Sequence, residues 1–444
     1  MRNHFLILLA SISVSIGFSQ EQPTSFSLEE AVAYAMEHNY SVINADRDLV
    51  DAQKQKWETI AGGLPQINGA ISYQNQLKQP VSLLPAELAG GEPGTFMPVV
   101  FSQPQSATAT ATLSQQIFDG SYIVGVQATK AFLEYSANNK EKTDLDIRKS
   151  VVEAYGNVLL AYESATILEK NKENLEKNLY ETQKIYENGL GDEESVEQLQ
   201  ITLSSIDNQL KNAIRLKGIT LQMLNVLIGL PLAHPTVLTE DLDVLTQQQI
   251  APLLLEEELN IENNIDYKIV ENLNKQRFYE LKLAKSRALP TLNAFVNYGS
   301  SSYSDDFNFL SGDAQWFDSS ILGFDLNIPI FSSLKRSATT QRAKIALEKA
   351  KTQKTEAEQQ IRLQVESAKS DYTLAIEQYN TAKQNLDLAE RIERKNEVKY
   401  SEGLATSFEL RQAQTQLYDT QQSYLQSMID VINKKTALEI ILNN

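Results

Sequence analysis

Two short stretches, YENGL at 186–190 and YSEGL at 400–404, interrupt two long helical patterns in the same way. Each interruption contains one glycine, Gly189 or Gly403, and the two glycines lie 214 residues apart. Glycine is the residue that most readily adopts the positive φ found where helices end. We therefore predict that both stretches are tight turns at the tips of helical hairpins.

The residues after each glycine suit the start of a second helix. Asp192 and Thr406 occupy matching places, and both residue types are good N-caps. The segment TSFE at 406–409 has the form of a capping box, in which a cap hydroxyl and a Glu carboxylate each bind a backbone amide. Each half of the chain therefore predicts an antiparallel pair of helices.

Apolar and small residues recur in alternating steps of four and three along these helices. Examples are Val151, Ala154, Val158, Ala161, Leu175 and Leu179, and in the second half Ile361, Val365, Ala368, Tyr372 and Ala375. This spacing predicts helices packed side by side along a seam. From 119 to 187 no proline interrupts the pattern, so the first long helix covers roughly 70 residues, or about 100 Å.

The whole sequence repeats itself in order. SLEEAVAYAMEHNYSV (27–42) aligns with LEEELNIENNIDYKIV (255–270), LPQINGAISYQ (64–74) with LPTLNAFVNYG (289–299), and LSQQIFDGSY (113–122) with LNIPIFSSLK (326–335). This self-similarity indicates a tandem duplication. We predict a first repeat over 21–229 with a helical hairpin at about 119–229, a connector over 230–254, and a second repeat over 255–444 with a hairpin at about 332–443.

The first twenty residues predict a secretory signal peptide, 1–20. Arg2 supplies a positive start, 5–16 an apolar run, and Gly17 and Ser19 small residues before a cleavage point. The run is too short to cross a membrane; the alternative is an anchoring helix. We expect the mature chain to leave the cytoplasm.

Composition excludes several classes of site. The chain has 444 residues, no cysteine and three histidines that stand apart, and its net charge is −17. Disulfides and Cys-ligated metals are therefore impossible, and the charge argues against a nucleic-acid partner and favours cations in any enclosed lumen. No phosphate loop, nucleophile elbow or metal-ligand spacing occurs, so we predict neither enzymatic activity nor a cofactor.

Four segments alternate apolar and polar residues with a period of two. They lie at about 64–78, 105–118, 289–300 and 319–331. Such alternation predicts strands with one apolar and one polar face. Phe295 departs from the alternation, and Asp325 falls on a polar face. We expect the segments between the strands, about 81–103 and 301–318, to be exposed loops.

These strands have two interpretations. They are either soluble hairpins packed on helices or part of the wall of a membrane barrel. Thin Ala/Thr strands with polar inner faces bury little in a soluble core, and a Lys or Arg on the lipid face of a barrel would cost about 2–4 kcal/mol at mid-bilayer; almost no charge falls on these apolar faces. Four strands cannot close a barrel, and open edges are not tolerated in lipid. A dimer, trimer or tetramer would supply eight, twelve or sixteen strands.

The doubled segments and the two Tyr-x-x-Gly-Leu tips resemble the TolC-type outer membrane efflux proteins, in order and over nearly the whole chain after residue 20. The resemblance implies an α+β membrane protein of the Gram-negative outer membrane. Each chain of a homotrimer would give four strands to a twelve-stranded β-barrel, set in outer membrane lipid above an α-helical tunnel across the periplasm. Such a passive duct docks to a periplasmic adaptor and an inner-membrane pump of the RND or ABC type.

The resemblance also implies that the tips form the periplasmic entrance, which closes like an iris. Tyr400 matches the family tyrosine that holds the second hairpin to its neighbour by hydrogen bonding. Glu409 matches a position where the family places an acidic ring in the constriction. Both have plainer interpretations, since Glu409 suits a capping box and Tyr400 can be the last heptad residue. Asp325 is expected to be solvated in the barrel lumen.

The chain departs from the family pattern at three tip positions. Ala405 stands where a basic partner is usual, Gln412 replaces a second acid, and Ser195 stands where the first hairpin often has Asp. The latch of the closed state is therefore weaker, or it is built from other residues. The candidates are Asp192, Glu193, Glu194 and Arg411.

The alternative function is an envelope coiled-coil scaffold without a pore. An enzyme ranks third, and an alternating-access transporter would need transmembrane helices to rock. The four alternating segments separate a duct from a scaffold, because a scaffold has no use for strands that face lipid.

Overall fold

The computed structural model describes residues 23–443, so the signal peptide predicted for 1–20 lies outside the described part of the chain. That part forms two compact units. The tip unit comprises 23–42, 145–257 and 368–440, and the sheet unit comprises 43–144, 258–367 and 441–443. Each unit takes segments from both sequence repeats, because the longest helices run from one unit into the other. No helix between residues 23 and 443 combines the length and the hydropathy needed to cross a bilayer.

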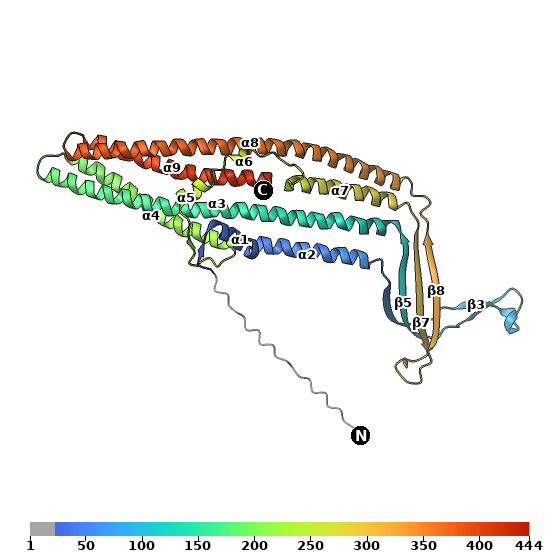
Figure 1. Ribbon diagram of the computed structural model, residues 1–444. Coiled ribbons are helices and arrows are strands. Elements are labelled where there is room, and N and C mark those ends of the chain that lie inside the picture. Colours follow the sequence, from blue (N-terminus) through green and yellow to red (C-terminus); the bar gives the residue numbers. More distant parts are fainter. Residues whose placement is uncertain (1–22, 444) are drawn as a thin grey trace, which may run out of the picture. The chain divides into compact units, whose positions relative to one another are not determined.

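A four-stranded antiparallel sheet is the main β element of the sheet unit (Figure 1). In spatial order its strands are β2 (Gln66–Asn75), β5 (Gln105–Asp119), β7 (Thr291–Ser304) and β8 (Phe317–Asn327). Each occupies a segment where alternation predicts a strand. Because β5 and β7 come from different repeats, their pairing joins the two halves of the sequence. Within the described residues, β2 and β8 each pair on one side only.

The register collects apolar residues of all four strands on one face. One row across the sheet, from β2 to β8, holds Ile67, Leu113, Val296 and Leu322. The next row, on the opposite face, holds Asn68, Thr112, Asn297 and Ile321. On that polar face the Asn297 amide donates a hydrogen bond to the Thr112 hydroxyl at 3.0 Å. Ile67 and Leu322 remain 76% and 67% exposed, so nothing in the described chain covers the apolar face at these positions.

Phe295 lies on the polar face, and its neighbour explains the break in alternation. It pairs with Gly323 on β8, and a Cβ atom added to Gly323 would overlap the Phe295 ring. The ring therefore covers a position that has no side chain of its own, as aromatic residues do beside glycines in designed sheets. The exception in the sequence is a local packing feature.

The structure differs from the prediction at the ends of the strands and in the segments between them. The segment 301–318 was predicted to be a loop, but β7 extends into it to Ser304 and β8 begins within it at Phe317. β8 ends at Asn327 rather than near 331, because Pro329 has no N–H to donate to a ladder. The segment 81–103, predicted to be a loop, contains a short ribbon. It consists of β3 (Ser82–Pro85), the 3-10 helix η1 (Ala86–Ala89) and β4 (Phe96–Val99). The Glu87 carboxylate steadies its turn by accepting the Gly94 N–H at 2.9 Å.

The helices of the sheet unit include α2 and α7 and the first parts of α3 and α8. Their bounds are α2 (Tyr40–Ala61), α3 (Gly120–Glu187), α7 (Ile265–Ser286) and α8 (Lys335–Ser401). The 68 residues of α3 agree with the length predicted from the heptad pattern. The alignment of 27–42 with 255–270 predicts similar helices in both repeats, but only the first has a long one there, α1 (Leu28–His38). In the second repeat, Asn264 instead caps the start of α7.

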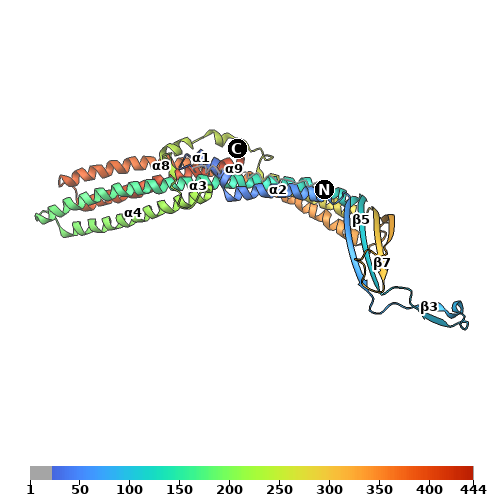
Figure 2. The ribbon, with the colours of Figure 1, turned by 90° about the horizontal axis from the view of Figure 1, so that it is seen from below.

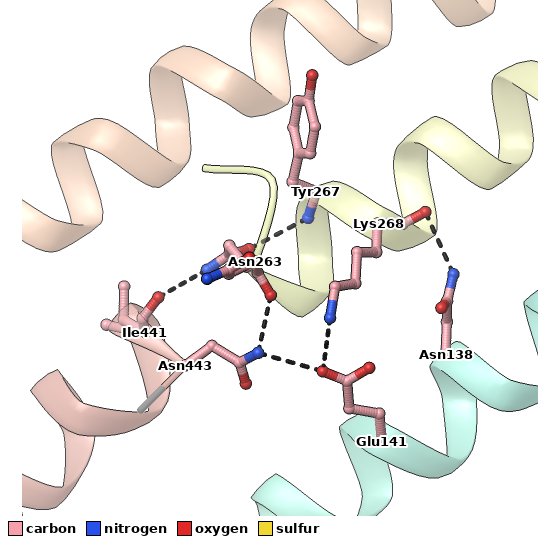
Figure 3. A network of polar contacts seen from close by, with 8 residues as sticks. Asn138, Glu141, Asn263, Tyr267, Lys268, Ile441 and Asn443 are labelled. Carbon is pink, nitrogen blue, oxygen red and sulfur yellow. Dashed lines mark hydrogen bonds and ion pairs between the residues drawn. The ribbon is translucent and has the colours of Figure 1, made fainter. Parts of the chain in front are cut away.

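A polar network ties α3, α7 and the last described residues together (Figure 3). The ammonium group of Lys268 on α7 lies 2.8 Å from the Glu141 carboxylate on α3. The Asn443 amide donates to the same carboxylate at 3.1 Å, and the Asn264 amide donates to the Ile441 carbonyl at 2.8 Å. The network therefore fixes the C-terminal residues against two helices of the sheet unit.

In the tip unit, α3 and α8 meet the helices that fold back along them, α4 (Glu193–Ile228) and α9 (Ser407–Leu442). Figures 1 and 2 both show these helices side by side. The contact between α3 and α4 is apolar, with Leu175, Leu199 and Ile206 in one buried cluster. Such a cluster stabilises the hairpin by removing apolar surface from water.

The predicted connector, 230–254, is held against the helices of the tip unit. It contains β6 (Val237–Leu238), α5 (Leu242–Gln248) and the start of α6 (Leu253–Glu256), and β6 pairs in parallel with β1 (Ser25–Phe26). Two tyrosine hydroxyls fix it in place. Tyr372 donates to the Gln249 carbonyl at 2.6 Å, and Tyr424 donates to the Asp243 carboxylate at 2.7 Å.

Candidate gate at the helical tips

Each hairpin of the tip unit turns at a glycine with positive φ. The values are +74° at Gly189 and +73° at Gly403. At the first tip the Leu190 N–H donates to the Ile185 carbonyl at 3.0 Å, and the equivalent bond of the second tip measures 2.7 Å. These bonds belong to the Schellman motif, which ends helices at glycine. A Cβ atom at either glycine would meet nothing within 4 Å, so backbone conformation rather than crowding selects glycine.

Each returning helix begins with an acidic residue and a hydroxyl residue three positions apart. The acid comes first on α4, and the hydroxyl residue comes first on α9. On α4 the cap is Asp192, whose carboxylate accepts the N–H of Ser195 at 2.7 Å and its hydroxyl at 3.0 Å. On α9 the cap is Thr406, whose hydroxyl accepts the N–H of Glu409 at 3.3 Å. The Glu409 carboxylate in turn accepts the Thr406 N–H at 2.7 Å, which completes the predicted capping box.

The hydrogen bonds of these caps also lower the pKa values of Asp192 and Glu409. Hydrogen bonds from the Ser195 N–H, and then from its hydroxyl, lower the pKa of the Asp192 carboxyl below its ordinary value. Bonds from the Thr406 N–H and hydroxyl do the same for the pKa of Glu409. Both effects arise because the donors favour the ionised form. Both tips therefore carry negative charge at neutral pH.

A hydrogen bond joins the two hairpins near their tips. The Tyr400 hydroxyl on α8 lies 2.7 Å from the Thr182 hydroxyl on α3. Thr182 is 3% exposed, so little water competes for the bond. The sequence marked Tyr400 but not its partner, because a threonine within a heptad pattern carries no signal of what it will meet.

A second polar contact joins the starts of α4 and α9. The hydroxyls of Ser195 and Ser407 lie 2.6 Å apart. Because the Ser195 hydroxyl already donates to Asp192, Ser407 is the donor in this pair. The three groups form a chain that runs from the second hairpin to the cap of the first.

The remaining tip candidates lie on the same two helices. Glu193 and Glu194 occupy the exposed first turn of α4, and Glu194 accepts a bond from Gln198 at 2.8 Å. The Arg411 guanidinium lies over the Phe408 ring, 5.4 Å from its centroid, in a cation–π arrangement. Charge is therefore exposed at the start of both returning helices.

Asp325 belongs to the sheet unit rather than to the tips. It pairs with Asn293 on β7 and lies on the polar face of the sheet. Hydroxyl and amide side chains such as Thr112 and Asn297 share that face. Asp325 thus adds a negative charge to an otherwise largely neutral polar surface.

An open groove of about 1270 Å³ runs between α8 and α9 in the tip unit. Most of the residues that line it are of polar type, and they include Glu377, Asp419 and Asp430, with Arg411 near the tip. Between residues 23 and 443 there is no group of three or more His, Asp or Glu side chains that could hold a metal ion. The tip residues join the two hairpins through the Tyr400–Thr182 and Ser195–Ser407 hydrogen bonds.

Comparison with known families gives one match that covers most of the chain. The model of the family described as "Outer membrane efflux protein" matches residues 34–230 and 261–444. The two matched stretches correspond to the two sequence repeats. This confirms the resemblance inferred from the doubled segments and the tips.

Solved structures share the fold at low sequence identity. The outer membrane protein VceC of Vibrio cholerae is 18% identical with a TM-score of 0.70, over 94% of this chain and 96% of VceC. The Campylobacter jejuni CmeC outer membrane channel is 17% identical with a TM-score of 0.72, over 96% and 90%. The open state of the Neisseria gonorrhoeae MtrE outer membrane channel is 18% identical with a TM-score of 0.71, over 94% and 89%.

A comparison with curated protein sequences gave no match. The family match nevertheless extends through both repeats and includes the tips, the strands of the sheet and the long helices. The chain therefore belongs to the outer membrane efflux protein family.

Proposed function

We propose that this chain is one protomer of a trimeric exit duct in the outer membrane of a Gram-negative bacterium. Substrates delivered by an inner-membrane pump would pass through a water-filled tunnel without chemical change. The duct opens and closes at the helical tips. Its partners are two further copies of itself, a periplasmic adaptor and a pump of the RND or ABC type.

The two-faced sheet with unpaired edges carries this proposal. Its apolar face exposes large side chains such as Ile67 and Leu322, while the opposite face carries amides and hydroxyls. Open strand edges are not tolerated in lipid, because their N–H and C=O groups would lose hydrogen bonds to water. Three copies, with β2 of each beside β8 of the next, would close twelve strands into a barrel that has no free edge.

The polar face of the sheet would then line the lumen. Its hydroxyl and amide groups favour a hydrated path, and Asp325 adds negative charge. Together with the net charge of −17, this favours cations over anions inside the duct. A passive duct needs no binding pocket for one particular substrate.

The tips suit a gate because the two hairpins are joined there by few and separable contacts. The Tyr400–Thr182 and Ser195–Ser407 hydrogen bonds are formed between hairpins rather than within them. Breaking them would let the tips of the hairpins move apart. The buried residues Leu175, Leu199 and Ile206 would stay together within the first hairpin, although Tyr418 of α9 packs against them. Glu409 and Asp192 would place negative charge around the entrance.

The groove between α8 and α9 offers a site for the adaptor. Its carboxylates, Glu377, Asp419 and Asp430, suit a partner helix that presents Lys or Arg. Such charge complementarity directs the encounter and sets the register of the contact. A partner held there could pull on α8 and α9 and so act on the tips.

Density-gradient fractionation of cell envelopes, followed by light scattering of the detergent-solubilised chain, tests the proposal. The chain should sediment with the outer membrane and have the mass of three copies. Recovery in the soluble periplasm as a dispersed monomer would contradict the duct. The scaffold alternative predicts that second result, and the exposed apolar face of the sheet does not favour it.

A further inference from the structure

A ring of three chains needs joints that the single chain does not contain. Three chains would bring six hairpins together, with one joint inside each chain and one between each pair of neighbours. The structure shows the joint inside the chain, at Tyr400–Thr182 and Ser195–Ser407. The joint between chains can be inferred from it, and this inference rests on the trimeric duct proposed above.

The two hairpins are equivalent at a constant offset of 214 residues. Gly189 corresponds to Gly403, and α4 and α9 each have 36 residues beginning at Glu193 and Ser407. The hydrogen bonds of the two tip turns also correspond, and Asp192 matches Thr406 as cap. Either hairpin can therefore take the place of the other in a joint of the same geometry.

Exchanging the hairpins converts each observed contact into a contact between neighbouring chains. Thr182 and Tyr400 become Asn396 and Tyr186. Ser195 and Ser407 become Glu409 and Glu193. A third contact between the hairpins, Asn171 to Gln421 at 2.9 Å, becomes Asn385 and Asp207.

Burial supports this assignment. In the joint inside the chain, Asn171, Thr182 and Ser195 are only 4%, 3% and 8% exposed. Their equivalents are more accessible, since Asn385 and Glu409 are exposed and Asn396 is half-buried. The second hairpin thus presents an open copy of the surface that the first hairpin has covered.

We propose that Tyr186 of one chain bonds to Asn396 of the next, and that Glu193 of one chain faces Glu409 of the next. A tyrosine hydroxyl and an asparagine amide can donate and accept, so the first pair can form a hydrogen bond. The second pair places two carboxylates where the chain's own joint has two hydroxyls. Two ionised carboxylates that face each other across the joint repel.

The joints within chains and between chains therefore differ in strength. In the joint inside the chain, two neutral hydroxyls meet at the starts of α4 and α9. In the joint between chains, two carboxylates would meet there and weaken it. The gate should open first along the three seams between chains. The duplication accounts for the shape of each joint, and the exchange of Ser for Glu accounts for which joint yields.

Disulfide trapping can locate the joints, because the chain has no cysteine of its own. Glu193→Cys/Glu409→Cys should give covalent dimers and trimers of the full chain in detergent after oxidation and denaturing electrophoresis. Ser195→Cys/Ser407→Cys is the matched control, and it should give a crosslinked monomer. Since Glu409→Cys removes part of a helix cap, Tyr186→Cys/Asn396→Cys provides a second test of the same seam.

The possible results separate this inference from the proposed duct. Interchain crosslinks in either seam pair support it. A trimer by light scattering in which neither pair crosslinks between chains overturns the seam and leaves the duct standing. A monomer in detergent overturns both.

Conductance gives an independent test of the like-charge seam. In planar bilayers, Glu193→Ser should reduce spontaneous openings roughly fivefold, because one repelling charge is lost at each seam. Glu181→Ser is the matched control, since Glu181 is an exposed acid on α3, eight residues before Gly189, and lies outside the exchanged contacts. Equal effects of the two variants would overturn the assignment of Glu193 to the joint.

Discussion

The hydroxyl of Tyr400 forms one of the hydrogen bonds that join the two hairpins. A Tyr400→Phe variant keeps the ring and removes the bond to Thr182. The buried Thr182 hydroxyl would then lack a partner, at a cost of about 1–3 kcal/mol to the closed state. We expect a higher resting conductance in single-channel recordings.

Two controls make this prediction specific. Tyr180→Phe removes the hydroxyl of a tyrosine on α3, the helix of Thr182, that is 65% exposed, and it should leave the resting conductance unchanged. Thr182→Val removes the other partner, and combining it with Tyr400→Phe should be less harmful than the sum of the single variants. A resting conductance unchanged by Tyr400→Phe would assign this tyrosine to packing alone.

Glu409 combines a structural and an electrostatic role, and two substitutions separate them. Glu409→Gln keeps a side chain that can complete the capping box but removes its charge. Glu409→Ala removes both. Both variants should lower the preference for cations, measured as a smaller reversal potential in a salt gradient.

Thermal melting distinguishes the two roles of Glu409. Only Glu409→Ala should also weaken the start of α9, because it removes the side-chain oxygen that accepts the Thr406 N–H. Glu58→Gln, an exposed acid on α2, is the charge control. A selectivity that stays at the wild-type value in both Glu409 variants would exclude an acidic ring at this residue.

Among the elements, the tip turns depend on backbone conformation. Gly403→Ala places a Cβ on a residue with φ of +73°, which costs roughly 1–2 kcal/mol in the left-handed region. We expect a lower melting temperature for this variant. Gly218→Ala, within α4 and in open space, should instead raise the melting temperature. Alanine is more favourable than glycine in a helix interior by up to about 1 kcal/mol.

The α3–α4 hairpin should also depend on pH. Lys172 and then Lys211, each bonded to the Asp207 carboxylate, lower its pKa to about 2. Because the folded pKa is depressed, the stabilisation is complete above the unfolded pKa, near 4, and is lost as pH falls through about 2. Asp207→Asn should therefore be less stable than wild type at pH 7.

Chemical denaturation at a series of pH values measures this difference. The gap between wild type and Asp207→Asn should close progressively between pH 4 and pH 2. The hydrogen bond to Asp207 raises the pKa of Lys172, so this lysine stays charged throughout the range and contributes no pH dependence of its own. A gap that stayed constant down to pH 2 would exclude the ion pairs as its source.

For the whole molecule, adjacent residues on β8 provide a test of which sheet face meets lipid. Leu322 and Ile321 are both large and apolar, and they are 67% and 60% exposed. Leu322 lies in the apolar row with Val296, and Ile321 lies in the polar row with Asn297. Leu322→Lys should cost about 2–4 kcal/mol at mid-bilayer, whereas Ile321→Lys should be tolerated.

Outer membrane fractionation and trimer yield measure this contrast. Leu322→Lys should reduce the trimer recovered from the outer membrane, while Ile321→Lys should leave it near wild type. The pair is closely matched because the residues are neighbours of similar size. Equal tolerance of lysine at both positions would argue against a lipid-facing side.

Much of the architecture followed from local patterns. The glycines at the tips, the capping box and the heptad seams depend on neighbours within a few residues, so the sequence predicted them. The strands followed from alternation for the same reason. Phe295 was an exception because its partner, Gly323, lies on another strand.

Other features could not be predicted because they join distant residues. Thr182 and Ser407 became candidates only when the fold placed them beside Tyr400 and Ser195. The ribbon within 81–103 was missed because its strands have only four residues each, too few for a clear period of two.

The sequence by itself determined the duplication, the long helices, the tip turns and the two-faced strands, since each is a repeated or short-range pattern. Only the tertiary structure decided that β5 pairs with β7 across the repeats, that both compact units draw on both repeats, and which side chains meet between the hairpins. The reason is physical. Periodicity specifies which face of an element will be buried, whereas the partner on that face depends on how distant parts of the chain pack together.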